Sequence, residues 1–380
     1  MVRMIRFYDA EVERFSLAHG TLQKKELDEI VDDFIDADPT SISWTRALKQ
    51  DLVKGRTFDF DANCLVQSVY RPFTKQWLYF NRRFNEMVYQ MPKIFPGAST
   101  KNLIICIAGP GCISGFTALI SEIPVELCVS AMKGGSQCFP QYLYDEKIAT
   151  DAVDLFGSSE AIAAHARRDA ITNEGLTHFQ SAYPDEAISK EDLFYYVYGL
   201  LHSEDYRERY ADNLSKELPR IPRVKSAADF RHFSQAGRDL AALHLHYETV
   251  AMYPGATVDT GGKTLTDAEY RVEKMKYGKQ GKLKDLTTLH YNAKITVTGI
   301  PLEAYDYVVN GKPALDWVVE RQCVKTDKDS GIVNDANDWA IETMGNPRYP
   351  LELFLRVITV SLETMKIVRA LPKLEIRDDG

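Results

Sequence analysis

The sequence has few cysteines, and none of them forms a pair with the spacing of a metal site or a redox motif. The six are Cys64, Cys106, Cys112, Cys128, Cys138 and Cys323, mostly within apolar stretches. Such cysteines are typical of reduced, buried side chains. A chain of 380 residues can also bury a large core without cross-links. We therefore expect a cytoplasmic protein.

Long hydrophobic segments are also lacking. The first residues contain no long apolar stretch and soon turn acidic, so we expect no signal peptide. Residues 102–121 carry no charge over 20 positions, about the length of a membrane span, but Gly109, Pro110 and Gly111 interrupt them. This segment is better interpreted as a buried strand over residues 103–108, a tight turn and a second short element. We expect no contact with a membrane.

The chain lacks an excess of positive charge. Lysine and arginine number 46 against 54 acidic residues, which gives a net charge of 46 − 54 = −8. A protein of this charge is not a polycation, so any binding of nucleic acid must use a local basic patch. Disorder is excluded by the 4 tryptophans, 20 tyrosines and 17 phenylalanines, because such a chain can bury enough apolar surface to fold.

Catalytic and cofactor signatures are missing too. The glycines at 109, 111 and 115 follow a predicted strand, but the third is one position late for a dinucleotide-binding loop. No Gly-Lys-Ser/Thr follows, and Pro110 removes an amide N–H that a phosphate would need. His244 and His246 would point in different directions on one helix, which disfavours a shared metal ion. We expect no catalytic site, no metal and no cofactor in this chain.

The patterns that are present indicate an α+β fold with two subdomains, an N-terminal mixed β-rich unit and a C-terminal helical unit with a β-hairpin. We expect an N-terminal helical connector over residues 1–57 and a β-rich α/β subdomain over 58–150. A linker region follows over 151–188. Residues 189–380 are predicted to form the helical subdomain, with a β insertion at about 254–300.

Local signals place individual elements. Apolar spacing predicts a helix over residues 23–36, and the alanine-rich residues 158–168 indicate another. The residues that open further predicted helices are Ser189, with Asp192 completing a capping box, Ser203, Ser226 and Pro350. Residues 287–298 alternate about Asn292-Ala293 like a hairpin.

Clustered basic residues are the clearest indication of a binding partner. Residues 271–284 hold six basic residues against one acid, and Gly278 and Gly281 predict a flexible loop that could neutralise DNA phosphates. The alternative is a solvated hairpin tip. Two further groups lie at 46–56 and 75–83. The candidate DNA contacts are Arg46, Lys49, Lys54, Arg56, Lys75, Arg82, Arg83, Lys274, Lys276, Lys279, Lys282 and Lys284, with Asn292 as a candidate base reader.

A series of ordered stretches resembles a known family. They are YRPFTKQWLY (70–79), QCFPQYLY (137–144), DLFYYVYGLLHS (192–203), YRERY (206–210), LPRIP (218–222), GIPLEAYDY (299–307), NPRYP (346–350) and SLETMK (361–366). Together they resemble the C-terminal specificity domain of type ISP restriction-modification enzymes, over about residues 41–371. In that family a nuclease, a RecA-type ATPase and an adenine methyltransferase precede this domain, which reads an asymmetric DNA sequence.

The resemblance implies a non-catalytic domain that recognises double-stranded DNA and directs methyltransferase and helicase-nuclease domains located elsewhere, in cis or in trans. Two alternatives remain at this point. The first is a free-standing nucleotide- or S-adenosylmethionine-dependent enzyme built on the glycines at 109–115. The second is a protein-docking module that does not read DNA.

Overall fold

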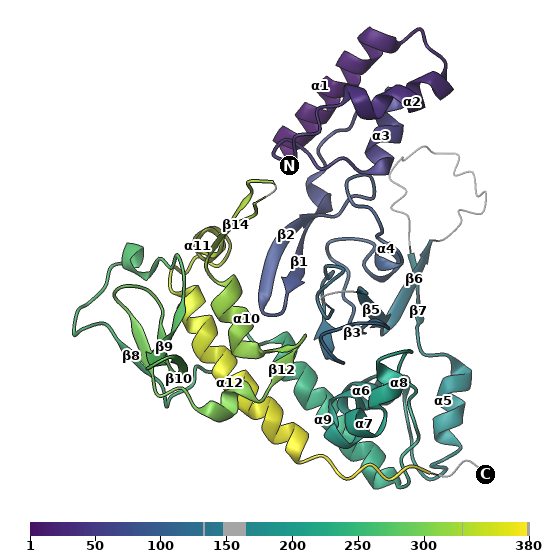
Figure 1. The fold of residues 1–380 in the computed structure, drawn as a ribbon. Helices are drawn as coiled ribbons and strands as arrows, with labels where there is room; N and C mark the ends of the chain where they lie inside the picture. The colour runs from purple at the N-terminus through teal and green to yellow at the C-terminus, as the bar shows by residue number, and fades with distance from the viewer. Residues whose placement is uncertain (132–133, 147–164, 329, 378–380) are drawn as a thin grey trace, which may run out of the picture. The chain divides into compact units, whose positions relative to one another are not determined.

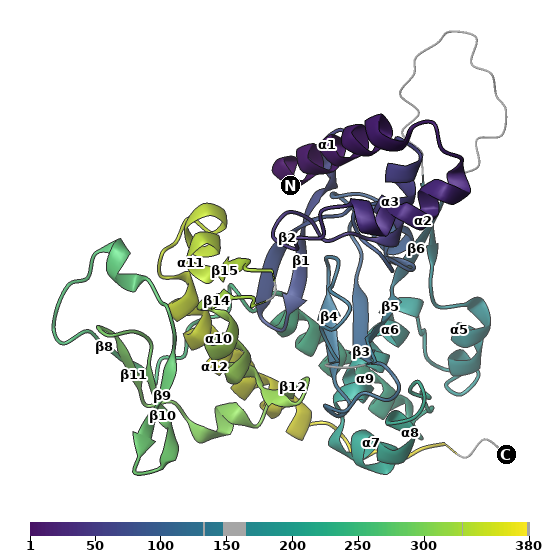
Figure 2. The same cartoon turned by 45° about the horizontal axis from the view of Figure 1, so that its top comes forward.

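The computed structural model describes residues 1–131, 134–146, 165–328 and 330–377, and its contacts divide the chain into two compact units (Figures 1 and 2). The first unit comprises Met1–Ser68, Trp77–Thr100 and Lys325–Asn334, and the second comprises Val69–Gln76, Lys101–Val324 and Asp335–Gly380. These bounds differ from the predicted subdomain limits. Part of the predicted β-rich segment groups with the N-terminal helices, because Phe58 and Phe84 pack against the core of those helices.

The first unit is built on three helices, α1 (Val2–His19), α2 (Lys24–Phe34) and α3 (Arg46–Val53). Their apolar faces meet at Tyr8, Phe15 and Leu52, which are almost completely buried. Residues 1–57 therefore have a core of their own. The unit also contains η1 (Ala62–Cys64), α4 (Met91–Ile94) and parts of two hairpins, β1 (Leu65–Arg71) with β2 (Thr74–Tyr79) and β14 (Val324–Thr326) with β15 (Val333–Asp335).

The second unit begins with a three-stranded antiparallel sheet of order β4-β3-β5. The central strand β3 (Ile104–Ala108) is buried along its whole length, as the predicted strand over 103–108 requires. Its neighbours are β4 (Ala118–Ser121) and β5 (Ser136–Pro140), and a separate ribbon pairs β6 (Tyr142–Glu146) with β7 (His165–Asp169). Helices cover this part: α5 (Asn173–Gln180), α6 (Lys190–His202), α7 (Glu204–Arg209), α8 (Ala211–Leu214) and α9 (Ala227–Leu245).

Helices α6 and α9 cross at two glycines, and this crossing sets their close approach. A Cβ atom on Gly199 would lie 2.1 Å from the Phe233 carbonyl oxygen, and one on Gly237 would lie 1.8 Å from the Tyr195 carbonyl oxygen. Both distances are far below van der Waals contact. The two backbones can therefore pack this closely only because neither residue has a side chain.

The rest of the second unit is a four-stranded antiparallel sheet backed by helices. Its order is β8-β11-β10-β9. One face packs with α10 and α12 around buried Leu289, Val297 and Phe354. The elements are β8 (Thr257–Asp259), η2 (Asp267–Tyr270), β9 (Lys276–Gln280), β10 (Leu283–His290), β11 (Thr296–Thr298), η3 (Leu302–Tyr305), β12 (Val308–Val309), β13 (Lys312–Pro313), α10 (Ala314–Arg321), α11 (Ala336–Asp338), the π-helical turn Trp339–Thr343 and α12 (Tyr349–Arg369).

Most local predictions are confirmed. Ser189 and Asp192 form the predicted capping box at the start of α6, and Ser203 and Ser226 cap α7 and α9. The hairpin about Asn292 is the β10–β11 connection. The helix predicted over 158–168 is wrong for its described residues, which belong to strand β7; residues 158–164 lie outside the described part. That stretch pairs with β6, where the Arg167 guanidinium lies 4.4 Å from the centroid of the Tyr142 ring.

Candidate nucleic-acid interface

Most basic residues of the 271–284 stretch lie on a paired hairpin rather than in a flexible loop. Lys276, Lys279 and Lys284 belong to β9 and β10 and Lys282 to the turn between them, whereas Arg271 and Lys274 precede β9. Strands β9 and β10 pair Gly278 with Asp285, Lys279 with Lys284 and Gln280 with Leu283. Of the residues of β10, only 288–290 pair with β11. The outer part of the β9–β10 hairpin therefore continues beyond the rest of the sheet. We call residues 278–285 the ribbon.

The base of the ribbon is anchored to the second unit. A bulge between Asp285 and Leu289 interrupts the pairing and turns the strands. The bulged carbonyl groups find partners elsewhere, since Leu286 accepts a 2.7 Å hydrogen bond from the Tyr305 hydroxyl and Thr287 accepts one of 3.1 Å from the Ile300 amide. The Tyr277 hydroxyl donates a 2.7 Å hydrogen bond to Asp316 on α10. The ribbon therefore extends from a fixed support.

The lysines of this region are exposed and uncompensated. Lys274, Lys276, Lys279, Lys282 and Lys284 are all solvent-exposed, and none forms an ion pair with another residue of the described chain. Lys279 and Lys284 stand directly opposite each other across the ribbon. Like charges in that position destabilise a strand pair. The fold alone gives no reason for this arrangement.

The arginine at the start of the stretch behaves differently. Arg271 is held by Glu273 at 2.7 Å and by Asp335 at 2.6 Å. The hydrogen bond to Asp335 raises the pKa of the Arg271 guanidinium. Its charge is therefore compensated within the protein, and the positive charge left for a partner belongs to the five lysines.

Asn292 is committed to the turn between β10 and β11. Its amide nitrogen donates 3.0 Å hydrogen bonds to the carbonyl groups of Glu269 and Arg271. Its side-chain oxygen accepts hydrogen bonds from the amides of Lys294 and Ile295 at 2.8 and 2.9 Å. A side-chain amide has two donor hydrogens and one acceptor oxygen, so this geometry uses its capacity and argues against base reading by Asn292.

In the first unit the structure brings residues of two predicted groups together. The buried carboxylate of Asp51 pairs with Arg56 at 3.1 Å and with Arg83 at 3.0 Å. Lys49 pairs with Asp32 at 2.6 Å. The remaining candidates of this unit, Arg46, Lys54 and Arg82, are exposed and have no ion pair with any described residue. Among the predicted contacts of this unit, these three are the ones that a phosphate could approach.

Lys75 departs from its predicted group. It belongs to the second unit, where its ammonium group lies 2.5 Å from a carboxylate oxygen of Glu248. Both side chains are largely buried, at 16% and 14% exposure, and the Tyr349 hydroxyl donates a 2.6 Å hydrogen bond to the other oxygen of Glu248. Lys75 thus stabilises the interior, and its burial is incompatible with the predicted contact to a phosphate.

The glycine-rich stretch after β3 forms the predicted turn. The Gly109 amide donates to the Gly135 carbonyl at 3.0 Å, and the Gly111 amide donates to the Ser215 carbonyl at 3.1 Å. A phosphate-binding loop needs such amides pointing toward the ligand. Here they are used within the protein, which argues against a nucleotide site.

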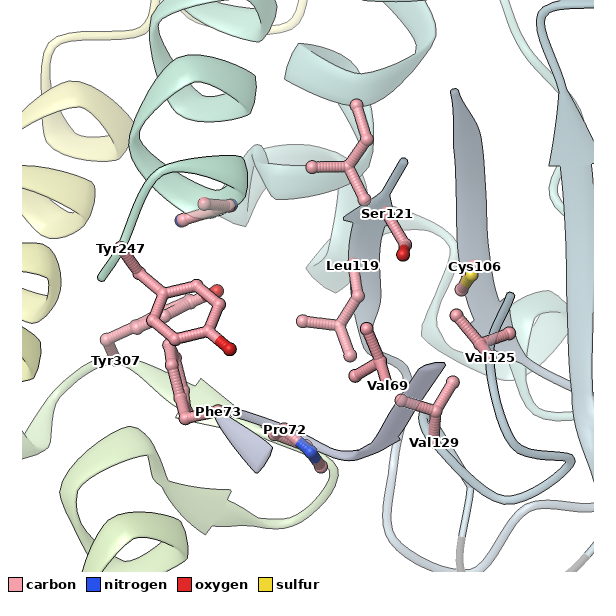
Figure 3. Close-up of a pocket in the computed structure, with 12 residues that line it drawn as sticks. Val69, Pro72, Phe73, Cys106, Leu119, Ser121, Val125, Val129, Tyr247 and Tyr307 are labelled. Atoms are coloured by element: carbon pink, nitrogen blue, oxygen red, sulfur yellow. The ribbon is translucent and has the colours of Figure 1, made fainter. Parts of the chain in front are cut away.

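An enclosed space lies between β4 and the end of α9. It is a cavity of about 40 Å³. Figure 3 shows that its lining is mainly apolar, with side chains such as Phe73, Leu119 and Val129. The Tyr247 hydroxyl points into it, and the hydroxyls of Tyr247 and Tyr307 have no hydrogen-bond partner in the described chain. Pockets for small molecules measure roughly 300–1,000 Å³. This space suits ordered water rather than a cofactor.

Two other kinds of site were sought in the described ranges. Residues 1–131, 134–146, 165–328 and 330–377 contain no group of three or more His, Cys, Asp or Glu side chains placed to hold a metal ion. No helix within those same ranges has the length and apolar character needed to cross a membrane.

The sequence interpretation missed two residues of the ribbon. Gln280 and Leu283 are cross-strand neighbours at its end, and the Leu283 side chain is 76% exposed. A signal was present, because Leu283 is an isolated leucine between Lys282 and Lys284 and has no apolar periodicity to join.

The family model and the similar solved structures indicate the same family. The model described as the Type ISP C-terminal specificity domain matches residues 1–353. A search of curated proteins found no match. Among solved structures, a nuclease-deletion mutant of the Type ISP restriction-modification enzyme LlaGI in complex with a DNA substrate mimic is 37% identical, with a TM-score of 0.79 over 99% of this chain and 26% of that one.

Two further solved structures are similar. The ATP-dependent Type ISP restriction-modification enzyme LlaBIII bound to DNA is 35% identical, with a TM-score of 0.77 over 93% of this chain and 21% of that one. The DrdV–DNA complex is 30% identical, with a TM-score of 0.76 over 98% of this chain and 33% of that one. The chain thus spans a third or less of each of these relatives.

Proposed function

Because this chain belongs to the family of Type ISP C-terminal specificity domains, we propose that it recognises a target sequence in double-stranded DNA and has no catalytic activity of its own. In this role it directs a DNA methyltransferase and a helicase-nuclease, carried by the same polypeptide or by a separate one. The similarity to restriction-modification enzymes whose structures contain DNA supports this proposal.

The observation that carries the DNA-binding part is the pair of lysines facing each other on the ribbon. Lys279 and Lys284 repel each other in the free protein, and no acid of the described chain pairs with either. A phosphate near both would relieve that repulsion and release counterions from the duplex. Two further exposed lysines lie nearby, Lys282 in the turn of the ribbon and Lys276 on β9 nearer its base. Further candidate phosphate contacts are Arg46, Lys54 and Arg82 in the first unit and Lys274 in the second.

The alternative functions find less support. A nucleotide-dependent enzyme would need free amides at Gly109 and Gly111, and both are bonded within the protein. A pure docking module would have no use for uncompensated lysines that face each other on a ribbon. It also predicts equal affinity for all DNA sequences, which a binding comparison can test directly.

The test is a salt titration of DNA binding. The wild-type chain and a Lys276→Ala/Lys279→Ala/Lys282→Ala variant are titrated into a fluorescent pool of random-sequence duplexes between about 50 and 200 mM salt, with anisotropy as the readout. Each lysine that contacts a phosphate contributes about 0.9 to the slope of log K against log salt. The variant should bind more weakly, with a slope smaller by up to roughly 2.7.

The control removes the same charge elsewhere in the second unit. Lys101, Lys216 and Lys373 are exposed and have no ion pair with a described residue. Their replacement by alanine should leave the slope unchanged. An equal loss in both variants would show that only net charge matters, and an unchanged slope in the ribbon variant would refute the role of these lysines.

A further inference from the structure

The ribbon has two chemically different faces. Side chains alternate along a strand, so the directly paired Lys279 and Lys284 share one face, and the paired Gln280 and Leu283 share the other. Lys284 lies on the same side as Tyr277, with its ammonium group 5.8 Å from the centroid of that ring. One face therefore carries the two lysines beside Tyr277, whereas the other presents Gln280 beside Leu283 near the turn, with Asp285 and Lys276 on the same side nearer the base of the ribbon.

The side chains of Gln280 and Leu283 have no structural task in the described chain. Leu283 is 76% exposed and belongs to none of the buried clusters. The Gln280 side chain is exposed and makes no hydrogen bond with a described residue. An exposed leucine next to an unbonded amide is suited to a ligand that offers both an apolar surface and hydrogen-bonding groups.

The end of the ribbon is narrow and conformationally defined. Only Gly281 and Lys282 connect the two strands, and Gly281 has a φ of +63°. A glycine with positive φ at the first position of a two-residue loop is typical of a type II′ turn, which matches the twist of paired strands. A Cβ atom at Gly281 would meet nothing within 4 Å, so glycine is required by its backbone conformation and not by crowding.

The dimensions fit the major groove of DNA. Three residue pairs lie between the bulge and the turn, and at about 3.4 Å per residue they extend roughly 10 Å. The major groove is about 8.5 Å deep and about 12 Å wide, and it admits a two-stranded ribbon. The four-stranded part of the sheet is too broad to enter, so the bulge at its edge marks the limit of insertion.

We propose that the ribbon enters the major groove and that Gln280 and Leu283 read an A·T base pair. This inference rests on the proposed DNA-binding function. The Gln280 amide bonds the N6 and N7 positions of adenine, a pairing that glutamine makes in two hydrogen bonds. Leu283 contacts the C5 methyl group of the thymine. Lys279 and Lys284, on the opposite face, approach the phosphates at the side of the groove.

The first experiment identifies the base pair. The wild-type chain, Gln280→Ala and Leu283→Ala each select from a randomised duplex pool, and the bound DNA is sequenced. We expect the wild-type motif to contain an A·T position whose preference is lost in both variants, while the other positions are retained. At that position Gln280→Ala should reduce discrimination by about 5- to 150-fold. Leu17→Ala, another strongly exposed leucine at 83%, is the matched control.

The second experiment tests which atoms of the A·T base pair the protein contacts. In the selected duplex, thymine is replaced by uracil at the A·T position, which removes only the methyl group. Wild-type binding should weaken about fourfold, the cost of one apolar carbon left uncovered. Leu283→Ala should not respond. Replacing the adenine by 7-deazaadenine, which lacks the N7 acceptor, should weaken the wild type and not Gln280→Ala.

The outcomes separate this inference from the proposed function. If the wild type selects a motif that both variants select unchanged, the reading role of the ribbon is refuted and DNA recognition stands. If the variants lose affinity equally for all sequences, the ribbon makes only nonspecific contacts, which also refutes the inference. If the wild type selects no motif, the proposed function fails as well.

Discussion

Replacing Lys279 by glutamate should make the protein more stable and its binding to DNA weaker. Lys279 stands directly opposite Lys284 on the ribbon, and no described acid compensates either charge. The substitution turns a repulsive pair into an attractive one at the same place. A single change therefore separates what the ribbon does for the fold from what it does for the ligand.

The gain in stability is small because the pair is exposed. Opposite-charge pairs across a strand pair contribute roughly 0.2–1 kcal/mol, and exposed ion pairs lie at the low end. We expect the free energy of unfolding to rise by about 0.5 kcal/mol. Urea denaturation at low salt measures this, and the gain should shrink as salt screens the pair.

The loss in binding is larger. One phosphate contact contributes about 0.9 × log(1/0.15), or roughly 0.7 in log K, between 1 M and 0.15 M salt, which is about fivefold. The substitution removes that contact and adds a repelling carboxylate, so we expect a decrease of about 10- to 30-fold in affinity and a salt slope smaller by one to two. Lys279→Gln should lose only the first fivefold, and Lys216→Glu, on the segment after α8, should change neither quantity.

The change in stability and the change in DNA affinity of Lys279→Glu together test the reasoning. Reduced stability accompanied by reduced affinity would mean that the ribbon unfolds, and the binding result would then carry no information on phosphates. Increased stability with unchanged affinity would refute the reasoning, because it would show a solvated hairpin tip and nothing more.

Three further predictions concern the second unit. Gly237→Ala should destabilise the protein by more than about 3 kcal/mol in urea denaturation, because its Cβ would meet the Tyr195 carbonyl at 1.8 Å and separate α6 from α9. Lowering the pH from 7.5 to 5 should reduce stability by about 2 kcal/mol through His244, because burial lowers its pKa from 6.5 to about 3 while the unfolded chain protonates near 6.5. The stability that depends on a neutral His244 is fully present well above pH 6.5 and is lost as the pH falls below that value. Lys75→Met should cost about 3 kcal/mol by leaving Glu248 buried without its cation, with no change in the salt slope of DNA binding.

Each of these three predictions has an outcome that would contradict it. Gly97→Ala, where a Cβ would meet only Thr100 at 4.0 Å, is the control for the helix crossing, and equal losses in both variants would refute the packing argument. A His244→Gln variant with the same pH dependence as the wild type would show that other groups dominate. A smaller salt slope in Lys75→Met would show that this lysine reaches DNA after all.

The starts of several helices could be predicted from the sequence because helix capping is local. Ser189 bonds the amide three residues on, and Ser226 does the same at α9, so the residues that make each cap are adjacent in the chain. The turn at 109–111 and the connection at Asn292 follow from equally short-range chemistry. The family, too, was recognisable from the order of short motifs along the chain.

What the sequence by itself determined is therefore the position of the capped helices and of the hairpin about Asn292, the family and the existence of a basic stretch at 271–284. Which cations remain available was decided only by tertiary structure, because an ion-pair partner can come from anywhere in the chain. Lys75 is compensated by Glu248, 173 residues away, and Arg83 by Asp51, whereas Lys279 faces another lysine. The register of the ribbon likewise placed Gln280 beside Leu283 on one face, since pairing across two strands depends on where the turn lies.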